Sequence, residues 1–406
     1  MAEIRGTTAS EFEELAEVFE KNFELHNEVG AGFSVYLEGE KVVDLTGGVA
    51  DSEGRPYDDD TLQMVFSTTK GITAMCAHLL VQRGELDLDA PVTQYWPEFA
   101  EADKASIPVS WLLCHRSGLI DVDRPMTLDQ ALDWDAVTSA LAASKPVWEP
   151  GTNHGYHAVT YGWLVGEVIR RVTGRSIGDF VQQEISGPLG AEFCIGLPDV
   201  QQARVAPLIP MSMEDLPIPA MAGDGGSGDG ASGGSADAPS GLIEMLDKLL
   251  GPGNLAGRAL SAPGGALAAE SVWNEPRVRA AQIPAANGVT NASSLARCYA
   301  SLVSTVDGKR LLEESTVRAA IKPQVEGPDA VLVFPIPFGL GFMTHSEMSP
   351  FLGGSSFGHY GAGGSVGFAD PDRRIAGGYV MNKMHMGLAG DPRSGALLEC
   401  TNRLMS

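Results

Sequence analysis

The sequence has few basic residues and no long apolar run. Lysine and arginine number 28 against 52 aspartates and glutamates, and the formal net charge is −24. A chain of this charge repels nucleic acid and anionic lipid, so we expect neither a nucleic-acid partner nor a membrane partner. No apolar stretch approaches the length that crosses a bilayer. Residues 1–6 also lack the apolar stretch of a secretory signal.

Cysteine is equally scarce. The cysteines are odd in number and scattered, and no two form a Cys-x-x-Cys pair; they are Cys76, Cys114, Cys194, Cys298 and Cys400. This arrangement favours neither a disulfide framework nor a cysteine-based metal site. Each cysteine is expected to be a small buried apolar residue. We therefore expect a reduced, cytoplasmic protein, and the sequence does not indicate its oligomeric state.

Hydrophobic residues make up 44% of the 406-residue chain, which is enough for a large buried core. Short β-rich runs cluster at both ends of the sequence, at residues 33–37, 41–45, 338–343, 365–369 and 376–381. A helix is expected beside each cluster, over 8–28 and 390–404.

The middle of the chain has apolar residues at helical spacing, as in 127–143, 159–172 and 293–303. The simplest assembly is an α+β fold, in which an antiparallel sheet is built from both termini and flanked by helices, with an inserted, mostly helical region. We predict a sheet domain from 1–90 with 290–406, and a helical domain from 91–289. Within the latter, residues 222–240 almost lack large apolar side chains and are expected to be flexible.

Ser67 and Lys70 stand at the start of an apolar stripe with helical spacing, so both are expected on one face of one helical turn. A serine hydroxyl is a weak nucleophile until a neighbouring base removes its proton, and a lysine three residues away is within reach. Burial and the positive end of the helix both disfavour the ammonium form, so Lys70 can serve as that base. The pair alone is weak evidence for a catalytic site, because a serine that caps a helix and is followed by a surface lysine has the same spacing.

Three further segments accompany the Ser-x-x-Lys pair. Residues 111–119 contain Leu-Leu-Cys-His-Arg-Ser-Gly-Leu, residues 150–158 carry Tyr156, and residues 357–365 read Phe-Gly-His-Tyr-Gly-Ala-Gly-Gly-Ser. Together they resemble the serine β-lactamase and penicillin-binding-protein superfamily, in its class C β-lactamase-like branch. The second and third segments are most similar to the family VIII carboxylesterases of that superfamily. The resemblance runs from about residue 30 to the C-terminus.

The resemblance implies a β-lactamase-like fold and a set of catalytic residues. Ser67 is the nucleophile, Lys70 and Tyr156 take its proton, and Tyr156 protonates the leaving alcohol. The backbone N–H groups of Ser67 and Ala362 form the oxyanion hole. No cofactor and no metal is implied. Which of Lys70 and Tyr156 is the resting base stays open, since the acylation base is disputed elsewhere in this superfamily.

The resemblance also implies that His359, Tyr360 and Gly361 bind the substrate, in place of the Lys-Thr-Gly signature of β-lactamases. Ala158 likewise stands where a Tyr-x-Asn motif would have asparagine. A neutral histidine holds the carboxylate of a β-lactam less well than a cation does. We therefore expect a serine carboxylesterase acting on small-molecule, short- to medium-chain esters. The alternatives are a β-lactamase or D-amino-acid peptidase or transacylase at the same site, and a catalytically inactive binding protein with this fold.

Two other motifs suggest rival sites. Ser365 lies in a Gly-x-Ser-x-Gly sequence, the form of the α/β-hydrolase nucleophile elbow, but residues 368–374 read as strand and turn where that elbow requires a helix. His154 and His157 flank Tyr156, but they lack the His-Glu-x-x-His pattern of a helical zinc site. Neither motif is favoured as the centre of the chemistry.

Overall fold

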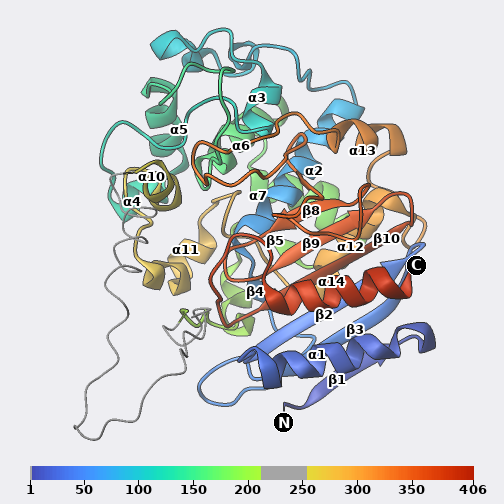
Figure 1. Cartoon of the computed structure of the whole chain (residues 1–406). Helices are drawn as coiled ribbons and strands as arrows, with labels where there is room; N and C mark the ends of the chain where they lie inside the picture. Colours follow the sequence, from blue (N-terminus) through green and yellow to red (C-terminus); the bar gives the residue numbers. More distant parts are fainter. Residues whose placement is uncertain (1, 212–253) are drawn as a thin grey trace, which may run out of the picture.

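The computed structural model describes residues 2–211 and 254–406 (Figure 1). The segment 222–240, for which flexibility is predicted, lies outside the described residues.

Strands from both ends of the chain form one sheet. Its order is β1-β3-β2-β10-β9-β8-β7, and every neighbouring pair is antiparallel. The strands are β1 (Ile4–Thr8), β2 (Gly30–Leu37), β3 (Glu40–Gly48), β7 (Met343–Thr344), β8 (Phe357–Tyr360), β9 (Val366–Asp370) and β10 (Ile375–Met381). β2 pairs with β10 along its length, which joins the two ends of the sequence at the centre of the sheet. The predicted sheet is confirmed.

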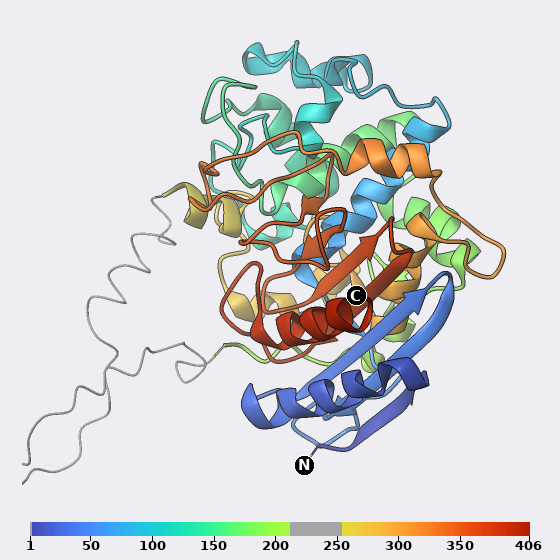
Figure 2. The same cartoon turned by 45° about the vertical axis from the view of Figure 1, so that its right-hand side comes forward.

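Helices cover both faces of this sheet. α1 (Glu13–Leu25) and α14 (Pro392–Leu404) lie side by side on one face in both views (Figures 1 and 2), while α12 (Ala292–Val303) packs against β2, β9 and β10. Adjacent side chains of a strand point to opposite faces. In β10, Gly378 faces α12, because a Cβ on it would lie 3.0 Å from the Ala296 nitrogen. The next residue, Tyr379, faces the other layer: its hydroxyl donates to Glu28, and Glu28 forms an ion pair with Arg393 of α14.

The helical region lies between the two groups of strands in the sequence and beside the sheet in space (Figure 1). Its described helices are α3 (Val109–Leu113), α4 (Leu128–Ala131), α5 (Trp134–Ala143), α6 (Thr160–Thr173), α7 (Ile177–Val181), α8 (Gly187–Leu189), α10 (Leu255–Ser261) and α11 (Pro276–Ala280). A small sheet has the order β4 (Gln63–Met64), β6 (Val289–Thr290), β5 (Phe193–Cys194). The boundaries of the two predicted domains stay a prediction.

α2 (Thr69–Gln82) is the central helix. It is buried from Thr69 to Leu80, and it contacts α6 and α7 on one side and β8 on the other. α13 (Glu314–Ala320) packs against it as well. The residues just before α2 therefore lie between the sheet and the helical region.

Some predicted elements are wrong. Residues 338–343 turn back on themselves, with Phe338 bridged to Met343, and only Met343 belongs to a strand, β7. The turn passes through Gly341, which has φ +92° and where a Cβ would lie 2.5 Å from Ala74 Cβ of α2. The helix predicted over 127–143 is two helices, because Asp133 caps the second one by accepting a hydrogen bond from the Ala136 N–H. The predicted first helix begins later than residue 8, since residues 4–8 form β1.

The five cysteines are free, and all but Cys194 are fully buried. Among the described residues, no helix combines the length and apolar character needed to cross a membrane.

Candidate active site

Ser67 lies in a short 3-10 turn (Phe66–Thr68) that leads directly into α2. The turn begins at Phe66, whose φ of +40° is uncommon for a residue other than glycine. Ser67 is 9% exposed, and its Oγ lies 3.0 Å from Lys70 Nζ in a hydrogen bond. The structure therefore brings the Ser-x-x-Lys pair together as the spacing predicts.

Lys70 is fully buried, and two backbone carbonyls hold its side chain. Nζ donates to Ala158 O at 2.6 Å and to Ala285 O at 3.0 Å. Burial lowers the pKa of Lys70 well below its usual value, which favours the neutral amine. A neutral amine has two N–H bonds and one lone pair. The two carbonyls take both N–H bonds, so the lone pair is left for Ser67.

Tyr156 is the third residue at this centre. Lys70 Nζ lies 4.8 Å from the centre of its ring. Burial raises the pKa of Tyr156 above its usual value, although a hydrogen bond with Ser67 acts in the opposite direction. The side chain is therefore a neutral phenol beside the hydroxyl of Ser67.

Asp329 fixes the backbone of Tyr156. Its Oδ1 accepts hydrogen bonds from the Tyr156 N–H at 3.1 Å and from the N–H groups of Val331 and Leu332 at 2.8 Å each. The other oxygen, Oδ2, is buried without a hydrogen-bond partner, and burial raises the pKa of this carboxyl group. Asp329 is not predicted from the sequence, because an aspartate after a proline in a loop carries no signal of a contact so distant along the chain.

His359 and Tyr360 point to opposite faces of β8. The His359 ring centre lies 6.2 Å from that of Tyr156, its Nδ1 is 2.7 Å from Tyr360 O, and its buried Nε2 has no hydrogen-bond partner. Burial lowers the pKa of His359 to about 3, so the ring is neutral. The Tyr360 hydroxyl donates to Pro350 O and its ring stacks on Phe351. The structure brings His359 to the site and directs the Tyr360 side chain elsewhere.

Gly361 allows the end of β8 to approach the turn that holds Ser67. A Cβ on Gly361 would lie 2.2 Å from Val65 O and 2.3 Å from Ser365 Oγ. Ser365 Oγ in turn donates to Val65 O at 2.8 Å and lies 3.0 Å from Thr68 Oγ1. The turn that contains Ala362 is thus tied to residues on either side of Ser67. Ser365 is buried and leads into β9, not into the helix that a nucleophile elbow requires.

A buried arginine, also missed by the sequence analysis, supports the same turn from the other side. Arg393 is fully buried and donates to Gly363 O at 2.7 Å. It forms ion pairs with Glu28 at 2.9 Å and Asp391 at 2.8 Å. Burial raises the pKa of Glu28 to about 7, although the positive charge of Arg393 acts to lower it.

The two histidines beside Tyr156 do not form a metal centre. His157 Nε2 is 2.9 Å from Ser117 Oγ and its Nδ1 is 2.7 Å from Gly155 O, so both ring nitrogens have protein partners. In the part of the chain that the structure describes, no group of three or more His, Cys, Asp or Glu side chains is placed to hold a metal ion.

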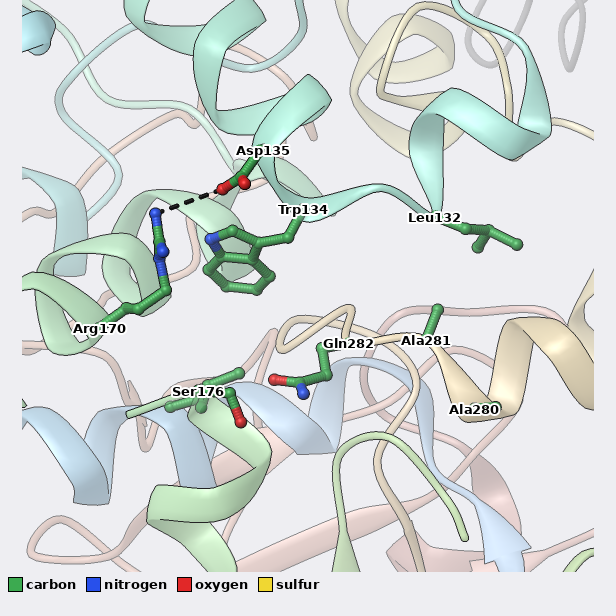
Figure 3. Close-up of a pocket in the computed structure, with 9 residues that line it drawn as sticks. Leu132, Trp134, Asp135, Arg170, Ser176, Ala280, Ala281 and Gln282 are labelled. Atoms are coloured by element: carbon green, nitrogen blue, oxygen red, sulfur yellow. Dashed lines mark hydrogen bonds and ion pairs between the residues drawn. The ribbon is translucent and has the colours of Figure 1, made fainter. Parts of the chain in front are cut away.

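A separate hollow of about 380 Å³ lies away from Ser67, between α5, α6 and the segment that follows α11 (Figure 3). Its charged groups pair with each other or with neighbours: Arg170 reaches Asp135 at 3.4 Å and Glu167 at 2.7 Å. Trp134 Nε1, on its wall, also donates to Glu167. The hollow therefore presents satisfied polar groups, unlike the site around Ser67.

The comparison with known proteins agrees with this geometry. The sequence matches the Beta-lactamase family over residues 15–399. The protein belongs to the Beta-lactamase family. This member is 33% identical to Esterase/beta-lactamase LipL of Mycobacterium tuberculosis, over 87% of this chain and 77% of that protein.

Two solved structures share its fold. A penicillin-binding protein homolog from Caulobacter crescentus is 36% identical, with a TM-score of 0.82, over 99% of this chain and 100% of the other. A family VIII carboxylesterase is 34% identical, with a TM-score of 0.82 and the same coverage. The predicted resemblance is confirmed for this Beta-lactamase family member.

Proposed function

We propose that the protein is a carboxylesterase that hydrolyses short- to medium-chain carboxylic esters through an acyl-enzyme on Ser67. Lys70 takes the proton of Ser67 as Oγ attacks the ester carbonyl. Tyr156 gives its phenolic proton to the leaving alkoxide, and the proton held by Lys70 replaces it. Water then attacks the acyl-enzyme by the reverse sequence, with no need for a cofactor.

The observation that carries this proposal is the hydrogen bonding of Lys70. Its two carbonyl partners, Ala158 O and Ala285 O, engage both N–H bonds of a neutral amine, and Ser67 Oγ lies at the remaining position 3.0 Å away. Burial supplies the neutral form. An ammonium group would donate to Ser67 Oγ at the same distance, so burial, which disfavours the charged form, decides that Ser67 donates to Lys70.

The oxyanion hole is assigned to the backbone N–H groups of Ser67 and Ala362. In support, Gly361 and Ser365 contact the residues on both sides of Ser67, which places the Ala362 turn against it. A preorganised donor of this kind contributes about 3 to 4 kcal/mol to the transition state in measured cases.

His359 favours esters over β-lactams. Its Nδ1 bonds the carbonyl of Tyr360, so Nε2 presents a lone pair, and burial keeps the ring neutral. A lone pair repels the carboxylate that β-lactams carry, whereas an uncharged ester meets no such repulsion. Family VIII carboxylesterase is the description of one similar structure, and LipL is named an esterase as well as a β-lactamase.

The test is covalent labelling. Intact protein is exposed briefly to p-nitrophenyl acetate or to an activated phosphonate, its mass is measured, and the modified peptide is mapped. We expect one adduct, on Ser67, and none in Ser67→Ala. A label on Ser365, or no label on any serine, would refute the proposal. Nitrocefin turnover comparable to ester turnover would favour the β-lactamase alternative.

The proposal places the enzyme in the cytoplasm, where thiols stay reduced. Five free cysteines are in keeping with that compartment.

A further inference from the structure

Two adjacent apolar side chains, Val333 and Phe334, are exposed near the catalytic tyrosine. Val333 is 59% exposed and Phe334 50% exposed, although most large hydrophobic residues of the described chain are buried. They form the tip of residues 329–335, called here the 329–335 loop. In both views the orange segment that contains this loop crosses in front of the helical region between α13 and β8 (Figures 1 and 2).

The base of the 329–335 loop is attached to the segment that carries Tyr156. Asp329 accepts the hydrogen bond of the Tyr156 N–H, and the Ala330 N–H donates to His154 O at 3.0 Å. Val331 is buried against Gly155, where a Cβ would lie 2.9 Å from Val331 Cγ2. The base of the loop is therefore held against the segment that carries the catalytic tyrosine.

The tip lies close to this base. The Val333 N–H donates to Asp329 O at 2.8 Å, and the Asp329 N–H to Phe334 O at 3.4 Å, so the loop is closed on itself. Four extended residues span at most about 14 Å, and closure shortens that distance. The tip therefore stays within that distance of Asp329, whose Oδ1 accepts the hydrogen bond of the Tyr156 N–H.

The conformation of Val333 is the second observation. Its φ is +71°, in the left-handed region that a β-branched residue rarely adopts. Strained residues persist where the surroundings hold them in place, and they cluster at functional sites. Here the strained backbone of Val333 holds an apolar side chain in solvent. Neither the solubility of the protein nor the packing of its core requires this arrangement.

A hollow beside the tip adds to the apolar surface. It has a volume of about 320 Å³ and adjoins the 329–335 loop at Pro335, with Pro337 and Met348 also on its wall. Glu326 and Glu347 line it too, so an acidic group is disfavoured there and an uncharged chain is not.

We propose that Val333 and Phe334 bind the apolar end of the substrate's alcohol group, so that the enzyme prefers esters of medium-chain alcohols. This inference rests on the proposed function. Tyr156 protonates the leaving alkoxide, so the alcohol lies on the side of Tyr156. The loop anchored to Tyr156 therefore borders the alcohol group, and the acyl chain, bound to Ser67, extends elsewhere.

The test compares alkyl acetates that differ only in the alcohol. Ethyl acetate and octyl acetate form the same acetyl-enzyme, so a difference in kcat/KM reports acylation alone. Acid release is followed in a pH-stat, with octyl acetate kept below the concentration at which it aggregates.

The variants are Val333→Gly, which keeps the left-handed conformation accessible while removing the side chain, and Phe334→Ser. Val200→Ser is the matched control, because Val200 is 88% exposed on a distant 3-10 turn (Asp199–Arg204).

We expect the double variant to lose about tenfold or more in kcat/KM for octyl acetate and less than twofold for ethyl acetate, with Val200→Ser unchanged for both. Three results would each overturn this inference and leave the proposed function standing. They are equal losses on the two acetates, no loss on either acetate, and a selective loss on ethyl octanoate, which tests the acyl side. A wild-type enzyme that hydrolyses none of these esters would overturn the proposed function and this inference together.

Discussion

Lys70 Nζ lies 3.0 Å from Ser67 Oγ, whereas Lys104, the other buried lysine of the described residues, has only backbone carbonyls as hydrogen-bond partners. Lys104 donates to Glu101 O, Ala142 O and Ser144 O at 2.7 to 2.8 Å, so all three N–H bonds of an ammonium group are used. Burial lowers the pKa of Lys104 to about 8 and also lowers that of Lys70 well below its usual value. One fold thus contains a structural lysine and a lysine that offers its lone pair to a serine.

This contrast predicts different effects of the same substitution. Lys70→Met should lower kcat/KM for p-nitrophenyl acetate by about 10³-fold, within the usual range for loss of a positioned base. Lys104→Met should leave kcat/KM near the wild-type value while destabilising the fold, because it leaves three carbonyls without donors. Steady-state kinetics and urea unfolding measure the two effects. A large kinetic defect in Lys104→Met with the fold intact would contradict the distinction.

The pH dependence of acylation should follow Lys70. Acylation needs the neutral amine, so activity is lost as pH falls through the pKa of Lys70, which burial places well below 10.5. We expect kcat/KM to rise with pH to a plateau that is reached below that value. A rise centred near the ordinary lysine pKa would mean that the amine is not desolvated as the structure indicates.

Tyr156→Phe should discriminate between leaving groups. The phenolic proton is needed by an alkoxide but hardly by p-nitrophenolate, which is stable as an anion. We therefore expect kcat/KM to fall about 10²-fold or more for ethyl acetate and much less for p-nitrophenyl acetate. Parallel assays of both esters provide the comparison. Equal losses on both would assign Tyr156 to the attack of Ser67 and not to the leaving group.

Asp329 should act on catalysis only by positioning Tyr156. Asp329→Ala removes the acceptor of three buried N–H groups, so we expect a loss of about 1–3 kcal/mol in the free energy of unfolding and a lower kcat. Asp329→Asn keeps an oxygen at Oδ1 and should restore most of kcat. Denaturant unfolding and steady-state kinetics on both variants provide the test. Failure of asparagine to rescue kcat would indicate that the carboxylate charge itself is required.

Glu28 should make stability depend on pH. Its pKa is about 7 in the folded protein against an ordinary value of 4.5, and burial is the main cause. Because the folded value is the higher one, the favourable contribution is complete below 4.5 and is lost as pH rises through 7. The shift corresponds to about 3 kcal/mol.

Guanidinium unfolding at pH 5 and pH 8 compares the wild type with Glu28→Gln. The glutamine cannot ionise and still reaches Arg393, so the variant should lose about 2.5 kcal/mol less than the wild type over this interval. The same loss in both proteins would assign the pH dependence to other groups.

Local spacing was sufficient to predict part of the site. Ser67 and Lys70 are three residues apart on one helical turn, a relationship that the sequence expresses directly. Tyr156 came from a motif shared with a known family. Asp329 and Arg393 could not be found this way, because their partners lie 173 and 365 residues away and only the folded chain brings them together.

The errors have the same origin. Residues 338–343 have the composition of a strand, but the chain turns back at Gly341, which passes too close to Ala74 of α2 to carry a side chain. Tyr360 was predicted in the substrate site beside His359; its side chain lies on the opposite face of β8, and its role in binding stays a prediction. The alternation of β8 excludes a shared role for the two side chains, whereas the motif alone treats them as one unit.

The joining of both chain ends in one sheet has a consequence for the timing of folding. Thr68, next to the nucleophile, bonds Ser365 across 297 residues of sequence, and β2 pairs with β10. During synthesis the serine leaves the ribosome long before the turn that is proposed to complete its oxyanion hole, and contacts this distant in sequence form slowly. Under the proposed mechanism, a nascent chain that already contains Ser67 stays inactive until residues 361–365 have been made and have folded against it.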